Sequence, residues 1–504
     1  MTTIDKNVEN CPPKADAMIQ SMRAVGYDVS MAIADLIDNS ITAEAKNIWI
    51  TQNWDHLNSY IKIVDDGIGM DERKLFNAMR LGSTNPLQER APNDLGRFGM
   101  GLKTASFSQC KLLTVRTKST DKVINTKCWD LDYVNEKEEW LLRTKAYQHS
   151  ESLLNDLENV KSGTIVLWEK LDRLISHNED DDENLNHFLR KMDEMQEILG
   201  MIFHRYIERP GGIKIFINSG QGGFVKIKHW DPYLKTHTAT RELSNEAVHI
   251  FGNSVNVRPF ILPHISKLNS TEHKEAAGPK GWNAQQGIYL YRKERLIVAG
   301  GWLDLGYKAE DHYKLARIQL DIPNSMDKEW QIDVKKATAK LPDAFRKNLL
   351  RLSKLTREKA SEVYRFRGKS VARKYDKVNR FVWKKTEHDG KIRYQIDQKH
   401  PIINDLLDEL GDKRNIGIKL IKLIENTVPV ETIIINNAEN PDSFTIPEYN
   451  PNSQNFPLQI WFMDLVEIEK HNGLTEKEAI EKVLSIEPFI NYPELISIYD
   501  EPEE

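Results

Sequence analysis

Cysteine is scarce in this chain of 504 residues. The three cysteines, Cys11, Cys110 and Cys128, are far apart, and none forms a CxxC pair. This spacing argues against a disulfide framework and against a zinc site built from paired cysteines. Because the N-terminus also has no signal-peptide pattern, we expect a protein of the reducing cytoplasm.

Long apolar segments and a strong net charge are also absent. No hydrophobic run approaches the roughly 20 residues of a membrane helix, so we expect no membrane contact. The net charge of −5 at pH 7 argues against a chain that binds nucleic acid over its whole surface. With 40% hydrophobic and 29% charged residues, the composition fits a soluble globular protein, and the length suggests about three domains.

Polar residues on a predicted helix form the first candidate motif. The apolar spacing from 31 to 41 predicts a helix, with Ser30 as its cap. Asp35 and Asn39 lie four residues apart and share one side of this helix. A carboxylate and a carboxamide so placed can hold Mg2+ and a water, because Mg2+ takes oxygen ligands and keeps several waters. Taken alone, the pattern fits a polar stripe on a half-buried helix better.

An acidic turn with two glycines forms the second motif. It follows a predicted strand at 60–65 and reads Asp-Asp-Gly-Ile-Gly-Met over 65–70. Glycine permits positive φ and a close approach of the backbone to a ligand. A buried Asp at the end of a strand, here Asp65, can accept a hydrogen bond from an exocyclic amine such as that of adenine. Alone, the motif is ordinary turn chemistry.

A glycine-rich segment at 96–103 forms the third motif and leads into a predicted helix start at 102–107. Backbone N–H groups at such a helix start bind phosphates, and Lys103 adds a positive charge. The preceding residues 85–94 are polar and contain two prolines, which is typical of a mobile lid. Each motif is weak by itself, but the three in this order and spacing indicate a nucleotide site.

These motifs resemble those of the GHKL superfamily, which includes gyrase-type topoisomerases, MutL, heat-shock chaperones and histidine kinases. The matching segments are DLIDNS, DDGIGM, GRFGMGLKTAS and, as a fourth motif, the turn and strand at 162–168. The resemblance implies an α+β fold that begins with a GHKL (Bergerat) nucleotide-binding sandwich over 15–210. It also implies ATP and Mg2+ as cofactors.

The resemblance assigns roles to individual residues. Asn39 would coordinate Mg2+, Asp65 would bind the adenine amine, and Thr164 would support Asp65. Gly67 and Gly69 would pack under the base, and the third motif would cover the phosphates. The nucleotide-contact set is Asp38, Asn39, Asp65, Gly67, Gly69, Met70, Gly96, Arg97, Phe98, Gly99, Met100, Gly101, Leu102, Lys103 and Thr164.

One residue departs from the family pattern. The family has Glu, the general base, where this chain has Asp35. Asp is shorter by one methylene, which places its carboxylate about 1 Å further from the attacking water, and such a displacement can slow a reaction about a hundredfold. Asp35 remains the candidate base, and Asp38 is an alternative that assists or replaces it. The substitution is consistent with slow hydrolysis or with a nucleotide switch that has little turnover.

A second resemblance lies at 326–338, which is similar to the end of the transducer domain in the MORC and MutL branch. In that branch a lysine contacts the terminal phosphate of ATP. Lys335 and Lys336 are both candidates, with a slight preference for Lys336. A strand pair at 286–298 with a turn at Lys293-Glu294 precedes them. Without the first domain, this segment would be an ordinary solvated basic loop.

The remaining organisation follows from composition. We expect a short strand at 128–133, another at 140–143, a helix at 151–160, and an exposed acidic loop at 178–183 before a helix at 185–204. The expected domains are an N-terminal arm (1–14), the ATP-binding domain (15–210), a transducer-like α/β domain (211–342), a basic helix (343–378), and a small α+β C-terminal region of unknown role with an acidic tail (379–504).

The segment 346–385 is rich in Lys and Arg and is predicted to be a long helix that starts after Pro342. A basic face of this kind can neutralise DNA phosphates. It is equally consistent with a solvated helix or with one that meets an acidic protein surface. The expected apolar side consists of Leu349, Leu350, Leu352 and Leu355.

The resemblance implies an ATPase that acts as a conformational clamp and dimerises through its N-terminal domains on ATP. The MORC and MutL branch points to DNA as its client, and prokaryotic relatives point to restriction-like or anti-phage defence. The alternative is a chaperone-like or scaffold ATPase that acts on protein partners, through 379–504, with little turnover. A kinase or topoisomerase is disfavoured, because neither a phosphoacceptor His helix nor a Tyr-bearing cleavage domain is recognisable.

Overall fold

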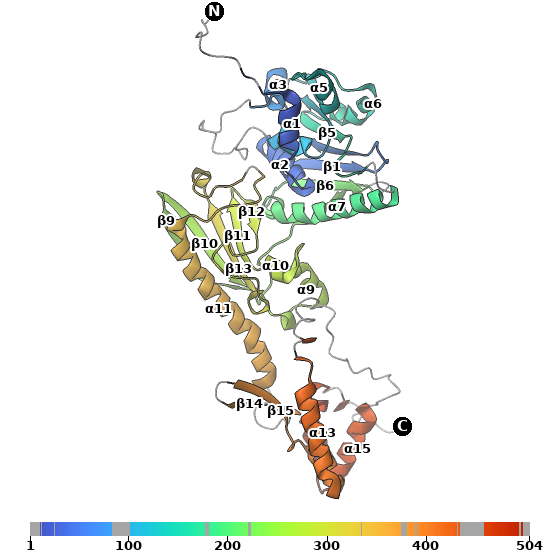
Figure 1. Cartoon of the computed structure of the whole chain (residues 1–504), viewed down its shortest axis with the longest axis vertical. Coiled ribbons are helices and arrows are strands. Elements are labelled where there is room, and N and C mark those ends of the chain that lie inside the picture. The colour runs from blue at the N-terminus through green and yellow to red at the C-terminus, as the bar shows by residue number, and fades with distance from the viewer. Residues whose placement is uncertain are drawn as a thin grey trace, which may run out of the picture. The chain divides into compact units, whose positions relative to one another are not determined.

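In the computed structural model the chain forms two compact units, Met1–Tyr364 and Arg365–Glu504 (Figure 1). Gly96–Met100 of the third motif and the expected lid lie outside the described residues. The structure describes residues 11, 13–24, 26–82, 101–176, 181–219, 223–333, 335–373, 381–388, 391–430, 432–433, 458–492 and 495–496.

A mixed seven-stranded sheet, in the order β4-β3-β5-β2-β1-β6-β7, forms the N-terminal part of the first unit. Most neighbours are antiparallel, and only the β1–β6 pair is parallel. Inward-facing residues such as Ile48 and Ile50 pack under the helices that cover one face. The strands are β1 (Asn47–Asn53), β2 (Tyr60–Asp65), β3 (Leu112–Lys118), β4 (Ile124–Asp130), β5 (Gly163–Glu169), β6 (Lys214–Ser219) and β7 (Val225–Lys226).

The covering helices are α1 (Ala15–Arg23), α2 (Val29–Thr42), α4 (Gly101–Phe107) and α7 (Asp181–Ile202). The predicted helix at 31–41 is present as α2, but its cap is Asp28 rather than Ser30. The Asp28 carboxylate accepts a hydrogen bond from the backbone N–H of Ser30 at 2.9 Å, because Ser30 already lies in the first turn.

Several predicted elements differ in the structure. The strand expected at 128–133 ends at Asp130, whose side chain caps the helix α5 (Leu131–Lys137). The segment 140–143 forms only one isolated bridge, between Arg143 and Cys128, and the helix expected at 151–160 is a 3-10 helix, Ser152–Asn159. Of the expected acidic loop, 181–183 form the first turn of α7, where carboxylates are favourable near the positive end of the helix dipole.

The expected domain boundary at residue 210 falls too early. Pro210-Gly211-Gly212 is a turn between α8 (His204–Glu208) and β6, and β6 pairs with β1 in the same sheet. The chain leaves this sheet only after β7. The parallel pairing of β6 with β1 joins residues far apart in the sequence, and the local turn signal carries no information about it.

The second sheet has the order β12-β11-β13-β10-β8, with β9 paired to β10. Its β11–β12 hairpin turns at Lys293 and Glu294, which both have positive φ, so the predicted turn is confirmed. One face of the sheet is apolar, whereas the other carries polar and aromatic residues beside α8. The strands are β8 (Arg241–Glu242), β9 (Glu246–Ile250), β10 (Asn253–Ile261), β11 (Gly287–Arg292), β12 (Arg295–Ala299) and β13 (Ala316–Ile322).

The long helix α11 (Asp343–Arg373) covers the apolar face, and it begins after Pro342 as predicted (Figure 1). Leu349 and Leu352 are buried in this contact. Leu350 and Leu355 are 41% and 40% exposed, so the expected apolar side is wrong for these two. Both lie off the helix face that carries Phe345, Leu349 and Leu352.

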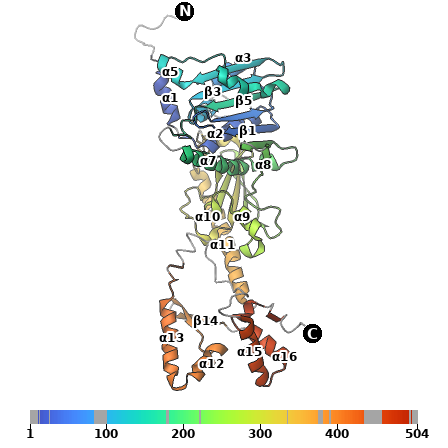
Figure 2. The same cartoon turned by 90° about the vertical axis from the view of Figure 1, so that its right-hand side faces the viewer.

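Beyond the end of α11, the described residues of the second unit form a hairpin, the α-helices α12, α13, α15 and α16, and short 3-10 turns (Figure 2). The sequence predicts a hairpin at 380–396 and helices at 402–410, 415–426 and 459–472, and all four are present. The helix α16 was not expected, although a capping box of Thr475 and Glu478 begins it. No helix in the described ranges is long and apolar enough to cross a membrane. The elements are β14 (Trp383–His388), β15 (Lys391–Ile396), α12 (Pro401–Glu409), α13 (Arg414–Thr427), α15 (Leu458–His471) and α16 (Glu476–Leu484).

Adjacent leucines on α11 test its packing. We expect Leu349→Ala to lower the free energy of unfolding by about 2–5 kcal/mol, because it leaves a cavity under the second sheet. Leu350→Ala, the same substitution at the exposed neighbour, should change it by about 0.5 kcal/mol or less. Urea unfolding of the full chain followed by circular dichroism measures both. Equal effects of the two substitutions would contradict the packing described here.

Candidate nucleotide site

Asp65 lies at the end of β2 and is buried. One carboxylate oxygen accepts a hydrogen bond from the Ser40 hydroxyl at 2.8 Å, and the other accepts from the backbone N–H of Gly67 at 3.0 Å. Burial raises the pKa of Asp65 to about 6, and these two hydrogen bonds oppose the rise. Each carboxylate oxygen can accept two hydrogen bonds, so capacity remains for an exocyclic amine.

Thr164 lies directly opposite Asp65 in the β2–β5 pairing, and its support of Asp65 in nucleotide binding stays a prediction. Its hydroxyl is 3.1 Å from that of Thr117 on β3. Thr117 also accepts a hydrogen bond from the Met70 backbone N–H at 2.9 Å, which ties the end of the acidic turn to the sheet. We did not single out Ser40 or Thr117 from the sequence, although Ser40 directly follows Asn39 in the first motif.

The two glycines of the turn are required by close packing. A Cβ at Gly69, which has φ +67°, would lie 2.0 Å from the carbonyl oxygen of Lys118. A Cβ at Gly67 would lie 2.7 Å from the carbonyl oxygen of Ala43, at the end of α2. The turn therefore lies against the backbone of both neighbours. The role of these glycines beneath a base stays a prediction.

On α2, Asn39 is exposed whereas Asp35 and Asp38 are buried. A Cβ added at Gly101 would lie 3.6 Å from a carboxylate oxygen of Asp35, so the start of α4 adjoins this carboxylate. The first and third motifs therefore meet at Asp35. No group of three or more His, Cys, Asp or Glu within the described ranges is arranged to hold a metal, but Mg2+ needs only one or two protein oxygens. The exposed carboxamide of Asn39 fits that requirement.

Two cations contact the buried carboxylates of α2. Both come from the part of the chain that forms the second sheet and the loop after β13, which we call the second sheet region. The Lys336 ammonium lies 3.0 Å from Asp35 and 2.6 Å from Asp38. The Arg295 guanidinium donates to Asp38 at 2.9 Å and to the backbone carbonyl of Lys336 at 3.0 Å. We call Asp35, Asp38, Arg295 and Lys336 the buried charge cluster. Arg295 is a component that we did not expect from the sequence.

The surroundings of Asp35 change the pKa of its carboxylate. Burial raises its pKa, whereas the adjacent Lys336 and Arg295 oppose that rise. The Tyr27 hydroxyl donates a hydrogen bond to its second oxygen at 3.0 Å. A carboxylate with a raised pKa suits proton abstraction near neutral pH. Tyr27 is a further positioning residue that no sequence motif indicated.

The loop that carries the two candidate lysines directs them to different partners. Asp333 shapes it by accepting hydrogen bonds from the backbone N–H groups of Ala337 and Thr338, at 2.8 and 3.0 Å. Lys336, at φ +51°, points into the buried charge cluster, whereas Lys335 donates to the carbonyl of Gly26 at 2.9 Å. The geometry therefore favours Lys336 as the residue that connects the loop to α2.

Lys103 contacts the backbone at the end of a neighbouring helix. Its ammonium is buried and donates to the carbonyls of Ala78 and Arg80, at 2.8 and 3.0 Å, at the end of α3 (Glu72–Met79). Burial lowers the pKa of Lys103 to about 8. In this arrangement Lys103 fixes α4 to α3, and a phosphate contact stays a prediction.

Asp65 should make nucleotide binding depend on pH. Because its pKa is about 6, Asp65 loses its charge as the pH falls through that value and becomes a poorer acceptor for an amine. We expect ATP affinity, measured by titration calorimetry, to weaken below about pH 6 in the wild type and much less in Asp65→Asn. The comparison cancels the titration of ATP itself. Ser40→Ala should move the midpoint upward, and parallel profiles for wild type and Asp65→Asn would exclude this role.

The chain is similar to known ATPases over its N-terminal part. Residues 27–164 match the family model described as histidine kinase-, DNA gyrase B-, and HSP90-like ATPase. A stretch of 87 residues is 30% identical to ATPase morc-1 of Caenorhabditis elegans. That match covers 17% of this chain and 10% of the relative. The N-terminal domain therefore belongs to the GHKL-type ATPases, and its resemblance is to their MORC-like branch.

Proposed function

We propose that this protein is a Mg2+-dependent ATP-binding and ATP-hydrolysing conformational clamp that dimerises through its N-terminal domains on ATP and acts on DNA. The observation that carries the proposal is the buried charge cluster. It places Lys336 and Arg295, both from the second sheet region, directly on the helix that holds the candidate base and the candidate Mg2+ ligand. The defence setting rests on the resemblance alone.

The cluster offers a physical route from nucleotide to conformation. Lys336 has one ammonium group, and it already contacts two carboxylates. A contact with a terminal phosphate would draw it away from Asp35 and leave Arg295 with Asp38. A ligand shifts a conformational equilibrium only by its differential affinity for the two states. The exchange of partners by Lys336 supplies such a difference between nucleotides with and without a terminal phosphate.

Three residues have separate roles in the proposed binding and hydrolysis of ATP. Asp65 binds the base, Asn39 offers an oxygen ligand, and Asp35 orients and deprotonates a water. Mg2+, when bound, neutralises charge on the phosphate oxygens. Release of Lys336 from Asp35 frees this carboxylate for the water. Turnover and the position of the second sheet region are thereby linked.

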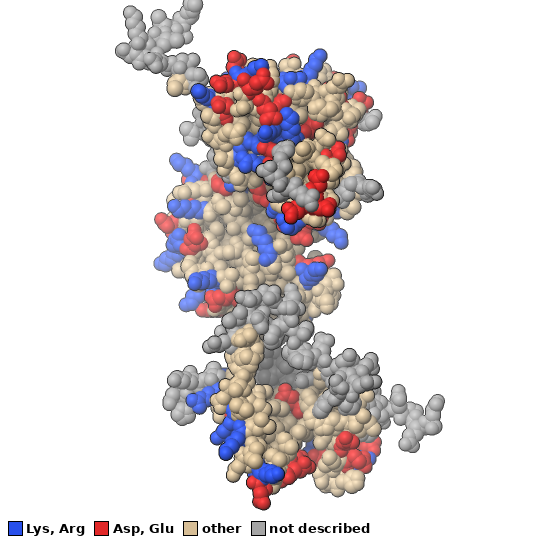
Figure 3. All heavy atoms as spheres, turned by 45° about the vertical axis from the view of Figure 1, so that its right-hand side comes forward, with Lys and Arg blue, Asp and Glu red and all other residues tan. Residues whose placement is uncertain are grey.

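The charge distribution limits how DNA can be contacted. On the face drawn in Figure 3, basic and acidic residues are interspersed over the first unit. Two arginines of α11 are also engaged with protein: Arg351 pairs with Glu246, and Arg357 is buried on the ring of Tyr313 at 3.8 Å. The basic helix therefore offers fewer free charges than its composition suggests. A scaffold ATPase with a protein client and little turnover is the second candidate, and the short Asp35 favours it.

Substitution of the two neighbouring lysines separates their roles. We expect Lys336→Ala to lower steady-state ATP turnover at least about tenfold, because it removes the group that links the loop to Asp35. Lys335→Ala removes the same charge one residue earlier and should retain most of the turnover. Phosphate release measures both, and ATP binding by calorimetry controls for folding. A larger loss in Lys335→Ala would reverse the assignment.

Lengthening the candidate base tests the departure from the family pattern. If the reach of Asp35 limits hydrolysis, Asp35→Glu should raise turnover, up to about a hundredfold, whereas Asp35→Asn should abolish it. Turnover by Asp35→Asn equal to the wild type would remove Asp35 from the base role.

Hydrolysis with and without duplex DNA, and light scattering under a non-hydrolysable ATP analogue, test the clamp. Stimulation by DNA and analogue-dependent dimers support it, whereas binding of ATP without either outcome favours the scaffold alternative.

A further inference from the structure

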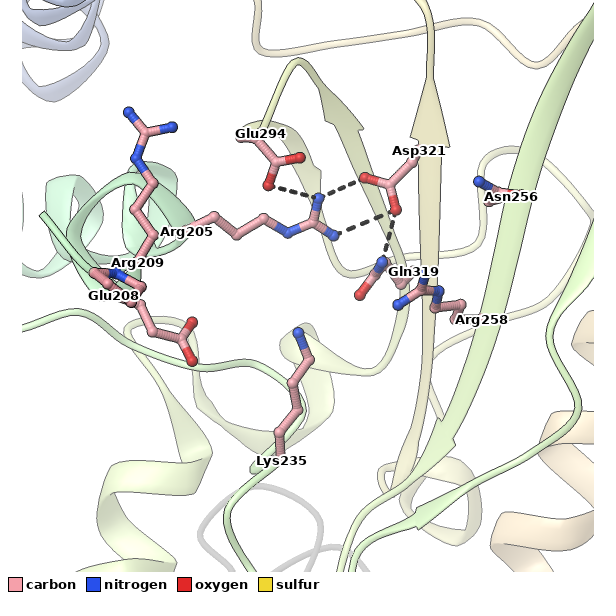
Figure 4. Close-up of a pocket in the computed structure, with 10 residues that line it drawn as sticks. Arg205, Glu208, Arg209, Lys235, Asn256, Arg258, Glu294, Gln319 and Asp321 are labelled. Carbon is pink, nitrogen blue, oxygen red and sulfur yellow. Dashed lines mark hydrogen bonds and ion pairs between the residues drawn. The ribbon is translucent and has the colours of Figure 1, made fainter. Parts of the chain in front are cut away.

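A pocket of about 580 Å³ lies where α8 meets the polar face of the second sheet, apart from the buried charge cluster. Its charged lining consists of four cations, Arg205, Arg209, Lys235 and Arg258, and three carboxylates, Glu208, Glu294 and Asp321. Figure 4 shows Lys235, Arg258 and Gln319 pointing toward the same space. The pocket thus has an excess of positive charge and is large enough for a phosphate ester.

Two of the three carboxylates already form ion pairs with Arg205. Its guanidinium lies on the ring of Tyr291, 3.4 Å from the centroid, and contacts both Asp321 and Glu294 (Figure 4). Asp321 also accepts a hydrogen bond from the Gln319 amide at 2.6 Å. Arg205 therefore holds the Asp321 side of the pocket in place. Arg258 lies beside Gln319 on the neighbouring strand β10, and Lys235 points toward the same space from another segment (Figure 4).

Lys235 and Arg258 lack anionic partners. No carboxylate within the described ranges lies at ion-pair distance from either side chain. Among the residues that the structure describes, the Arg258 Nε atom and the Oε1 atom of the buried Gln319 both lack a hydrogen-bond partner, and these two residues face each other across the β10–β13 pairing. A buried donor without a partner is costly. The Nε atom itself is closed to the pocket, but the Arg258 and Lys235 side chains both line it, and an oxyanion there would pair with their charges.

We propose that this pocket binds a phosphate group, held by the guanidinium fork of Arg258 and the ammonium of Lys235. An Arg fork matches two phosphate oxygens, and a flexible Lys adds a point charge. The shared chemistry allows two sources, a backbone phosphate of DNA or a small phosphate ester. The DNA source rests on the proposed function. The small ester does not.

The test uses the full chain with its nucleotide site saturated by a non-hydrolysable ATP analogue. The variants are Lys235→Gln, Arg258→Gln and Arg258→Lys. The matched control is Lys145→Gln, because Lys145 is an exposed lysine in the ATPase domain, away from the pocket lining. Binding of a fluorescein-labelled duplex is followed by anisotropy at several salt concentrations. Binding of inorganic phosphate is followed by calorimetry. Thermal unfolding and affinity for the analogue show that each variant is folded.

For the DNA source we expect Lys235→Gln and Arg258→Gln to weaken duplex binding about tenfold and to lower the salt slope by about one each. Arg258→Lys should lie between Arg258→Gln and the wild type, because it keeps the charge and loses the fork. A second result is that the wild type binds phosphate but no duplex, and that the variants lose their affinity for phosphate. That result would support the pocket as a phosphate site and would contradict the proposal that the protein acts on DNA.

Three outcomes would overturn the pocket. Duplex binding that is unchanged in all pocket variants, without phosphate binding by the wild type, leaves the DNA clamp intact and removes this site. Absence of binding for both probes removes the site regardless of the client. A loss of duplex binding in Lys145→Gln equal to that in Lys235→Gln would show general charge attraction rather than a site.

Discussion

Two buried carboxylates on one turn of α2 constrain the arrangement of the first unit. The side chains of Asp35 and Asp38 are 1% exposed, and burying a charged group is unfavourable unless it is paired. The cations that pair with them come from residues 295 and 336, far along the chain. The ATPase domain and the second sheet region therefore share one electrostatic contact, and neither can rearrange there without changing the partners of the other.

The two faces of the second sheet divide its roles in the same way. One face is apolar and is covered by α11, which stabilises the sheet. The other face carries Arg258, Gln319 and Asp321 and lies beside α8 at the end of the ATPase domain. Period-two alternation along β10 and β13 produces both faces from the same strands. Polar and aromatic contacts thus lie where the two sheet regions meet, whereas the apolar contact with α11 lies on the other face.

Local patterns predicted much of this structure. The helix that carries Asp35 and Asn39, the strand that ends at Asp65, and the turn at Lys293-Glu294 each follow from residues close in sequence. Arg295 was not predicted as part of the site, because its contact with Asp38 spans 257 positions and no local periodicity encodes it. The exposure of Leu355 also depends on where the second sheet lies. The cap was assigned to Ser30 instead of Asp28 for a local reason, because the helix begins at Val29, two residues before its apolar spacing indicates. The alternative between Lys335 and Lys336 likewise needed the loop geometry that Asp333 imposes.

The central claim is that Lys336 distinguishes nucleotides by exchanging Asp35 for a terminal phosphate. The most direct measurement is the ratio of the dissociation constants for ADP and ATP, determined by calorimetry for the wild type and for Lys336→Ala. The account predicts that the wild type binds ATP more tightly than ADP and that Lys336→Ala loses most of this preference while its affinity for ADP stays close to that of the wild type. An equal preference for ATP in both proteins would contradict it.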